Sequence, residues 1–479
     1  MKHSSSSAAV AAAVRDELHR YSIGEKLPSS RSLVERFGVS PVTVSQALAI
    51  LSDEGLVVTR PGAGVFRADA SSAALRIVDT SWQEIALAAE EGEPVPRSVD
   101  ASAIAMSLAV PQPGLIAFNG GYLHPSLQPA QALSASLARA ARRPDAWEMP
   151  APEGMIALRT WFARQIGGAR GSVTAAQVLV TSGGQAALAT TLRALTPPGT
   201  PILVESPTYP GVLAAARRAG LRPVPVPVDR DGVRLDHLEN AFAATGARAF
   251  YCQPMFQNPT GAVLAADRRA KVIEAAHTAG AFVVEDDYAR YLGHGGPLPA
   301  PLVADDPYGV VVHISSLTKP TSPNLRVGAV AARGPVLERL RAIQLVDSFF
   351  VSRPLQEAAL DLVTSTAWPK HLRRISAGLS ERRDAMLAAL DRELPGLAPV
   401  YAPSGGYHLW LALPGGTSEL TLVDSLLRVG VVVSPGRPYF AAEASAPYIR
   451  LSFANTPGID EIAEGIHRMA TVISETKVL

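Results

Sequence analysis

Lys319 is the residue of this chain whose type and setting best suit covalent chemistry. A lysine amine held in a dry pocket can attack a carbonyl group and form an imine. Six of the 44 basic residues are lysines, and Lys319 lies between an apolar segment at 310–314 and the turn Pro-Asn-Leu-Arg-Val-Gly at 323–328. The alternative is a solvated surface lysine, and this setting favours the buried nucleophile.

The elements that must position this lysine are indicated by short apolar segments that alternate with helical stretches beyond residue 115. The predicted strands are 177–180, 201–204, 249–252, 281–284 and 310–314. Such alternation is typical of an α/β domain around a mostly parallel sheet, where functional residues collect at the carboxyl ends of strands. Polar or glycine residues near those ends are Gly183, Gly184, Gln185, Tyr209, Asn258, Asp286, Tyr288, Ser316, Thr318 and Arg326.

These residues together resemble the site of a fold type I aminotransferase, a family that uses pyridoxal 5'-phosphate. The resemblance covers about residues 115–475, and it implies a large domain, a small C-terminal α+β domain and a homodimer. It makes Lys319 the catalytic residue, which condenses with the cofactor aldehyde. Asp286 would keep the pyridine nitrogen protonated, and its spacing from the lysine, 319 − 286 = 33 residues, is similar to that of the family.

The other candidates would hold the cofactor ring and its phosphate. In the resemblance, Asn258 and Tyr288 donate hydrogen bonds to the ring phenolate oxygen. Tyr209 would stack on the ring, although an ordinary core aromatic is an almost equally good interpretation of Tyr209 alone. The phosphate would meet a helix N-terminus and a charge-assisted arginine contact. The residues of this phosphate cradle are Gly183, Gly184, Gln185, Ser316, Thr318 and Arg326.

Arg450, in Ile-Arg-Leu-Ser-Phe, stands where these aminotransferases place the arginine that binds a substrate α-carboxylate. The segments Gly405-Gly-Tyr-His408 and Pro435-Gly-Arg-Pro-Tyr439 also fit the family frame. Some relatives carry a second effector-binding cation two residues after the stacking tyrosine, whereas this chain has Gly211. An effector with a distal carboxylate is therefore disfavoured. No metal site is predicted.

Residues 1–70 follow a different pattern. The predicted elements are helices at 8–20, 28–38 and 40–55 and strands at 56–60 and 65–67. Serine caps and first-turn prolines mark the second and third helix starts, and a glycine-rich turn joins the two strands. On the third helix Val44, Leu48 and Leu51 share one face, which leaves Thr43, Ser45 and Gln46 on the other.

This segment resembles a GntR-type winged helix-turn-helix through Leu27-Pro-Ser-Ser-Arg31 and Gly62-Ala-Gly64. The resemblance implies double-stranded DNA as a partner. The implied DNA-binding residues are Arg31, Ser40, Thr43, Gln46 and Gly62. Pro41 and Ser45 replace cations that are common in the family, which weakens the salt-dependent phosphate attraction, so we expect dimeric binding to two half-sites. A three-helix packing module is the alternative.

The composition of the chain limits the possible functions less strongly than these motifs do. Residues 1–70 carry eight basic and seven acidic residues, so bulk charge does not indicate DNA binding. The single cysteine, Cys252, excludes an intrachain disulfide and fits a reducing cytoplasm. No apolar run approaches the roughly 18 residues of a membrane span. The expected domains are 1–70 and 115–479, joined by a linker at 71–114 with one short helix at 82–89.

A DNA-binding domain joined to an aminotransferase-like domain resembles the architecture of the MocR/PdxR-like regulators. The leading hypothesis is a transcriptional regulator that senses pyridoxal phosphate, or an amino acid or amine bound to it as an aldimine. The alternative is a functional aminotransferase with an accessory DNA-binding head, because every residue needed for imine chemistry is present. A third hypothesis is a cofactor reservoir whose winged helix binds another protein.

Overall fold

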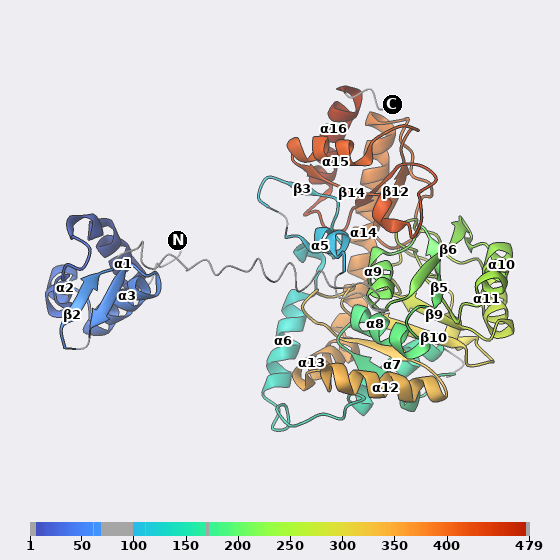
Figure 1. Cartoon of the computed structure of the whole chain (residues 1–479), viewed down its shortest axis with the longest axis horizontal. Coiled ribbons are helices and arrows are strands. Elements are labelled where there is room, and N and C mark those ends of the chain that lie inside the picture. Colours follow the sequence, from blue (N-terminus) through green and yellow to red (C-terminus); the bar gives the residue numbers. More distant parts are fainter. Residues whose placement is uncertain (1–5, 61, 69–98, 111, 169–171, 476–479) are drawn as a thin grey trace. The chain divides into compact units, whose positions relative to one another are not determined.

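The computed structural model describes residues 6–60, 62–68, 99–110, 112–168 and 172–475 (Figure 1). The chain divides into two compact units, residues 1–91 and 92–479, which are described separately. Within the described residues no helix is long and apolar enough to span a membrane.

The first unit is a three-helix winged helix. Its elements are α1 Ser6–Glu17, α2 Ser30–Phe37, α3 Pro41–Asp53, β1 Val57–Arg60 and β2 Gly64–Arg67, with β1 and β2 antiparallel. The serine cap and first-turn proline predicted for the third helix are present, because Ser40 Oγ accepts from Thr43 N and Pro41 opens α3. Ser29 Oγ likewise accepts from Ser32 N and caps α2, so Pro28 precedes that helix, and its predicted place in the first turn is wrong. Gly38 ends α2 with a φ of 62°, a conformation that glycine adopts without steric cost.

The boundaries of these helices differ from the prediction by a few residues. The predicted helix 8–20 ends at Glu17 and continues as a single 3₁₀ turn, Leu18–Arg20. The third helix ends at Asp53 rather than Gly55. Leu33, Val44 and Leu51 are fully buried between the helices, so the predicted apolar face of α3 is its packed face.

The second unit is built on an eight-stranded sheet of order β4-β11-β10-β9-β8-β5-β6-β7. The strands are β4 Val178–Thr181, β5 Pro201–Ser206, β6 Arg222–Asp229, β7 Gly232–Val233, β8 Ala249–Cys252, β9 Phe282–Asp287, β10 Val311–Ser316 and β11 Gly328–Ala331. The five strands from β10 to β6 are parallel, and β11 and β7 are antiparallel to their neighbours. The mostly parallel sheet is confirmed. Strand β9 runs further than predicted, so Asp286 lies inside its carboxyl end.

Helices cover both faces of this sheet (Figure 1). They are α6 Ala130–Ala141, α7 Ile156–Gly167, α8 Gly184–Leu195, α9 Pro210–Arg218, α10 Leu235–Thr245, α11 Ala266–Thr278, α12 Pro335–Ser348 and α13 Arg353–Thr364. One buried cluster joins the sheet to α7, α10, α11 and α13, and another joins it to α8, α9 and α12. Because both faces of the sheet are buried, the sequences of the central strands are continuous apolar runs.

The long helix α14 Ala367–Glu393 connects this layer to a small α+β domain, as predicted (Figure 1). That domain contains a three-stranded antiparallel sheet, order β12-β15-β14, with its own apolar core. Its elements are β12 His408–Ala412, α15 Glu419–Arg428, β13 Val431–Val432, β14 Ser434–Pro435, β15 Tyr448–Ser452 and α16 Ile459–Glu475. An early strand, β3 Ile116–Ala117, pairs with β13, so residues that precede the large sheet in the chain pack against the small domain.

One further helix, α5 Ser102–Leu108, lies within the predicted linker 71–114. Asp100 accepts a hydrogen bond from Ser102 N at the start of this helix, 2.9 Å away. The short helix predicted at 82–89 falls outside the described residues.

Candidate functional site

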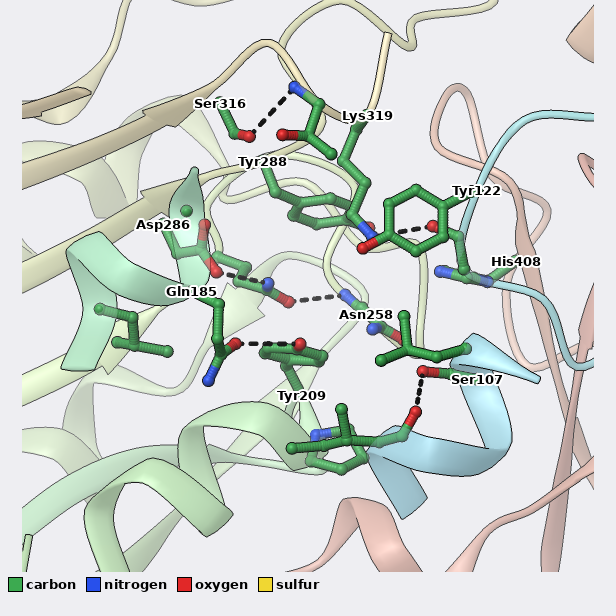
Figure 2. A pocket seen from close by; sticks show the side chains of 18 of the residues that line it. Ser107, Tyr122, Gln185, Tyr209, Asn258, Asp286, Tyr288, Ser316, Lys319 and His408 are labelled. Carbon is green, nitrogen blue, oxygen red and sulfur yellow. Dashed lines mark hydrogen bonds between the residues drawn. The ribbon is translucent and has the colours of Figure 1, made fainter. Parts of the chain in front are cut away.

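A cavity of about 370 Å³ lies where the carboxyl ends of the central strands meet the small domain and α5 (Figure 2). Its volume falls in the range of small-molecule sites. The predicted site residues that line it are Gly184, Gln185, Tyr209, Asn258, Asp286, Tyr288, Ser316, Thr318, Lys319, Arg326 and Arg450. Gly183 is not part of this lining, but it adjoins the Arg326 guanidinium.

The Lys319 amine lies in the middle of this cavity. Its Nζ donates to the carbonyl oxygen of Gly121 at 2.8 Å and lies 3.8 Å from the ring centroid of Tyr122 (Figure 2). Burial lowers the pKa of Lys319 to about 7, and the positive charge of Arg450 acts in the same direction. At neutral pH this amine is therefore partly uncharged, as a nucleophile that attacks carbonyl groups must be.

Asp286 is held in position from one side. Its Oδ2 accepts from the hydroxyl of Tyr251 at 2.7 Å and from Nε2 of Gln253 at 3.0 Å. Among the described residues no donor bonds to Oδ1, and Asp286 lines the cavity. Burial raises its pKa, while the two hydrogen bonds favour the carboxylate. The carboxylate can therefore accept one more proton donor from a bound molecule.

Beneath Asp286 lies a second buried acid that the sequence did not indicate. Glu205 Oε2 accepts from Gln253 N at 3.1 Å and from Gln257 Nε2 at 3.2 Å. Burial raises the pKa of Glu205 to about 7. Gln253 thus bridges the two acids and fixes the orientation of Asp286.

The loop before α8 and the loop after β10 form a polar cradle. Gly183 has a φ of 86°, and a Cβ there would lie 3.1 Å from the Arg326 guanidinium carbon, so only glycine leaves this space open. Thr318 Oγ1 is buried without a hydrogen-bond partner in the described part of the chain. Ser316 Oγ accepts from Thr318 N at 3.2 Å, and Arg326 donates to Ser182 O at 2.8 Å. An anion at the α8 N-terminus would satisfy the unpaired hydroxyl.

Three predicted ring contacts already have protein partners. Tyr209 donates to Gln185 Oε1 at 3.1 Å, which holds its ring beside the cavity. The Tyr288 hydroxyl donates to Phe256 O at 2.7 Å, so donation to a ligand would require that bond to break. Asn258 Oδ1 accepts from Arg450 Nη1 at 3.2 Å, which leaves its amide nitrogen as the donor toward the cavity.

Arg450 projects from β15 in the small domain and is 2% exposed. Besides Asn258, it donates to Asn119 O at 2.8 Å and to Ser434 Oγ at 3.4 Å, and its Nε has no partner among the described residues. Its hydrogen bonds to the described residues all go to uncharged oxygens, although this buried cation lines the cavity. A ligand carboxylate would complete its coordination.

Several lining residues were not predicted from the sequence. Ala103, Ile104, Ser107 and Leu108 come from α5, and Gly121 and Tyr122 follow β3. Tyr407 donates to the same Gly121 carbonyl that Lys319 contacts, at 2.6 Å. Tyr407, His408 and Tyr439 stood in motifs that fitted the family frame, so their motifs offered a signal, whereas α5 offered none.

The predicted DNA-binding residues all lie in the first unit. Arg31 has a side chain 91% exposed and only a 3.8 Å ion pair with Glu35, a surface contact of little energetic value. Ser40 and Thr43 bond to each other at the start of α3. Gln46 is exposed on α3, and Gly62 lies at the wing tip between β1 and β2.

Comparison with known proteins defines the class. Residues 119–466 match the family described as aminotransferase class I and II, and residues 6–66 match the bacterial regulatory proteins of the gntR family. The chain therefore belongs to the aminotransferase class I and II family, and it carries a GntR helix-turn-helix domain at its start, as in the MocR/PdxR-like regulators.

The relatives of this chain include both transcriptional regulators and aminotransferases. An uncharacterized HTH-type transcriptional regulator of Escherichia coli, YdcR, is 29% identical over 90% of this chain and 91% of its own length. The 2-aminoadipate transaminase of Thermus thermophilus is 33% identical over 78% of this chain and 94% of its own length. The crystal structure of α-aminoadipate aminotransferase LysN from Thermus thermophilus, complexed with N-(5'-phosphopyridoxyl)-L-leucine, superimposes with a TM-score of 0.74 at 31% identity, covering 82% of this chain and 98% of that one.

The cofactor of this family is pyridoxal 5'-phosphate, and the cavity fits it. The space kept open by Gly183 and the unpaired Thr318 hydroxyl suit the phosphate, and Asp286 Oδ1 suits a protonated ring nitrogen. The family match to a GntR domain likewise implies that the first unit binds DNA.

Proposed function

We propose that this protein is a transcriptional regulator that binds operator DNA through its winged helix and responds to an amino acid or amine bound at its pyridoxal phosphate site. Action on chromosomal DNA would place it in the cytoplasm. Two hydrogen bonds through Asn119 carry the proposal: Arg450 donates to the backbone oxygen of Asn119, and the Asn119 amide donates to Met106 O of α5 at 2.7 Å. The carboxylate-binding cation is thus one residue away from the first described helix after the DNA-binding unit.

Each part of the site has a task in this proposal. Bound pyridoxal phosphate supplies an aldehyde for amines and a ring that withdraws electrons. Thr318, Ser316 and Arg326 would hold the phosphate, and Asp286 would keep the ring nitrogen protonated. Lys319 would hold the cofactor until an incoming amine displaces it, and Arg450 would bind the α-carboxylate of an amino acid.

The cavity favours an effector with a single carboxylate. Among the described residues that line the cavity, the cations are Lys319, Arg326 and Arg450. The proposal already assigns each of them to the cofactor or to the α-carboxylate of the effector. At Gly211 a Cβ would lie 2.2 Å from the Tyr209 ring, so no longer side chain, charged or not, fits there while Tyr209 keeps its position. Apolar α5 residues such as Ile104 and Leu108 would then face the effector side chain.

We also propose that the protein is a homodimer. Large apolar side chains are exposed on two adjoining segments: Trp147, Met149, Ile156, Val346 and Phe349, at 61–83% exposure. The segments adjoin because Gln344 donates to Pro152 O and Arg353 pairs with Asp145. Exposed apolar residues gathered in this way are typical of an interface, and a twofold dimer would suit two DNA half-sites.

A functional aminotransferase is the second candidate, because the uncharged fraction of Lys319 and the paired Asp286 are what transamination needs. A paired assay on one cofactor-loaded preparation separates the two. A regulator should change its operator affinity when amino acids are added, by the fivefold to 150-fold typical of allosteric coupling, and turn over slowly with 2-oxo acids. Fast transamination with DNA affinity indifferent to amine and cofactor would establish the enzyme instead.

Asn119→Ala tests the second of the two hydrogen bonds through Asn119. The substitution removes the side-chain bond to Met106 and keeps the backbone oxygen that Arg450 uses. We expect amino acid binding close to that of the wild type and a DNA response that is reduced or lost. Thr160→Ala, which removes a hydroxyl bonded within α7 away from the cavity, is the control. A full DNA response in Asn119→Ala would contradict this route of coupling.

A further inference from the structure

The exposed side chains that the structure describes on α3 carry no charge. Between Pro41 and Ser52, which are also exposed, the solvent-facing residues are Val42, Ser45, Gln46 and Ala49. They follow a spacing of three and four residues and so form one stripe. The opposite face, with Val44, Ala47, Leu48 and Leu51, is buried in the core of the unit. Residues 41–52 contain no lysine, arginine, aspartate or glutamate.

Val42 stands out within this stripe. Its side chain is 65% exposed, although valine is an unfavourable residue for an open helix position. It is the second residue of α3, directly after the first-turn Pro41. In a helix-turn-helix the second helix enters the major groove, and its N-terminal residues contact the base edges. Val42 is therefore placed to meet a base rather than a protein core.

The chemistry of the stripe selects among base pairs. In the major groove, guanine is read mainly by arginine or lysine, adenine by asparagine or glutamine, and thymine by apolar contact with its 5-methyl group. The stripe lacks the cations for guanine, and its short polar Ser45 can bond to any base. It offers the Gln46 amide for adenine and the methyl groups of Val42 and Ala49 for thymine.

We propose that α3 reads A·T base pairs at the centre of each half-site, with Val42 and Ala49 contacting thymine methyl groups and Gln46 bonding to adenine. Phosphate attraction is supplied by other elements. Arg31 on α2 is 91% exposed, and Arg60 ends β1 with its guanidinium 4.7 Å from the ring centroid of Phe66. The cations that position the DNA thus lie on other elements than the uncharged stripe of α3, which specifies the sequence.

The test begins with selection from a randomised duplex DNA library by the full-length, cofactor-loaded protein. We expect the enriched half-site to contain A·T pairs at its centre. The best duplex is then resynthesised with deoxyuridine in place of each central thymidine, which removes only the 5-methyl group. Affinity should fall about fourfold for each methyl contact, the equivalent of ~0.8 kcal/mol for one buried methylene-sized group.

Variants assign the contacts to residues. Val42→Ala should bind the thymine duplex more weakly and lose most of its deoxyuridine effect, whereas Val42→Thr, which keeps one methyl group, should retain part of it. Gln46→Glu should change the preferred adenine to cytosine at one position, because a carboxylate accepts from cytosine N4. Ile23→Ala removes another exposed apolar residue, 60% exposed and outside α3, and should behave like the wild type.

Three outcomes overturn the inference. A half-site centred on G·C pairs would show that other groups read the sequence. A deoxyuridine effect that is absent, or unchanged in Val42→Ala, would remove the methyl contact. If no sequence is enriched, the inference fails together with the proposed function, whereas enrichment without methyl dependence leaves the regulator intact and overturns only the reading by α3.

Discussion

The rate at which the cofactor-free protein captures pyridoxal phosphate should depend on pH through Lys319. At pH 7 a lysine with the ordinary pKa of 10.5 is uncharged in roughly three molecules of ten thousand. With its pKa lowered to about 7 by burial and by Arg450, the Lys319 amine is about half uncharged at that pH. The gain in reactive amine is therefore on the order of a thousandfold over a solvated lysine.

The sign of the pH effect follows from the lowered pKa. Below pH 7 the amine is increasingly protonated, so the capture rate should fall about tenfold per pH unit, and above pH 7 it should level off. Arg450→Met removes a positive charge and should move the midpoint up, whereas Asp286→Asn removes a negative charge that favours the protonated amine and should move it down.

Stopped-flow absorption after mixing with pyridoxal phosphate, at constant ionic strength from pH 5.5 to 10, measures the rate. Borohydride reduction and peptide mass mapping then locate the adduct among the six lysines. A rate that keeps rising tenfold per unit to pH 10 would show an ordinary exposed amine. An adduct on Lys271 or Lys370, or capture that persists in Lys319→Ala, would refute the assignment.

Three further predictions test other parts of the molecule. Arg450→Lys should weaken binding of leucine by about 10-fold to 150-fold, the value of one charge-assisted hydrogen bond, and spare 3-methylbutylamine, which lacks the carboxylate; equal losses in a spectral titration would contradict carboxylate binding. Gly183→Ala should weaken cofactor binding about 5-fold to 150-fold in equilibrium dialysis, because its φ is 86° and its Cβ would meet Arg326. Gly415→Ala is the control, because a Cβ there would meet nothing within 4 Å and Gly415 does not line the cavity. Arg31→Ala should weaken DNA binding uniformly across sequences and reduce the salt slope by about one in fluorescence anisotropy; a loss confined to one sequence would argue against a phosphate contact.

Much of the fold was predictable because its signals are local. The serine caps at Ser29 and Ser40 depend on residues only three positions away, and the structure contains both hydrogen bonds. All five predicted strands are present in the sheet. A strand that is buried on both faces is a continuous apolar run, which can be recognised in the sequence without knowing the strands that pair with it. The helix end at Glu17 was less accurate, since no glycine or proline stands at that boundary. The end of α3 was closer to the prediction, because Gly55 follows the C-cap Glu54 with a φ of 70° and closes the helix.

The candidate site was predictable where its residues stand in motifs. Eleven of the twelve predicted small-molecule residues line one cavity, and Gly183 adjoins it through Arg326. The detailed bonds were not predictable. Tyr288 donates to Phe256 O, and Gln253 connects Asp286 with the buried Glu205, because these contacts depend on how β8, β9 and the loops after them pack. Glu205 lies inside an apolar strand, and nothing in its neighbours along the chain marks it as part of a network.

The helix α5 is the part of the cavity that no sequence motif indicated. Its sequence, Ser-Ala-Ile-Ala-Met-Ser-Leu, has no ionisable group and lies within the predicted linker. Its importance comes from position, since Ile104 and Ser107 line the cavity while Asn119 joins Met106 to Arg450. An effector can change DNA binding only if it binds two arrangements of the protein unequally. Because α5 lines the cavity and is the first described helix after the DNA-binding unit along the chain, we expect the two arrangements to differ at α5, whichever amino acid the cavity prefers.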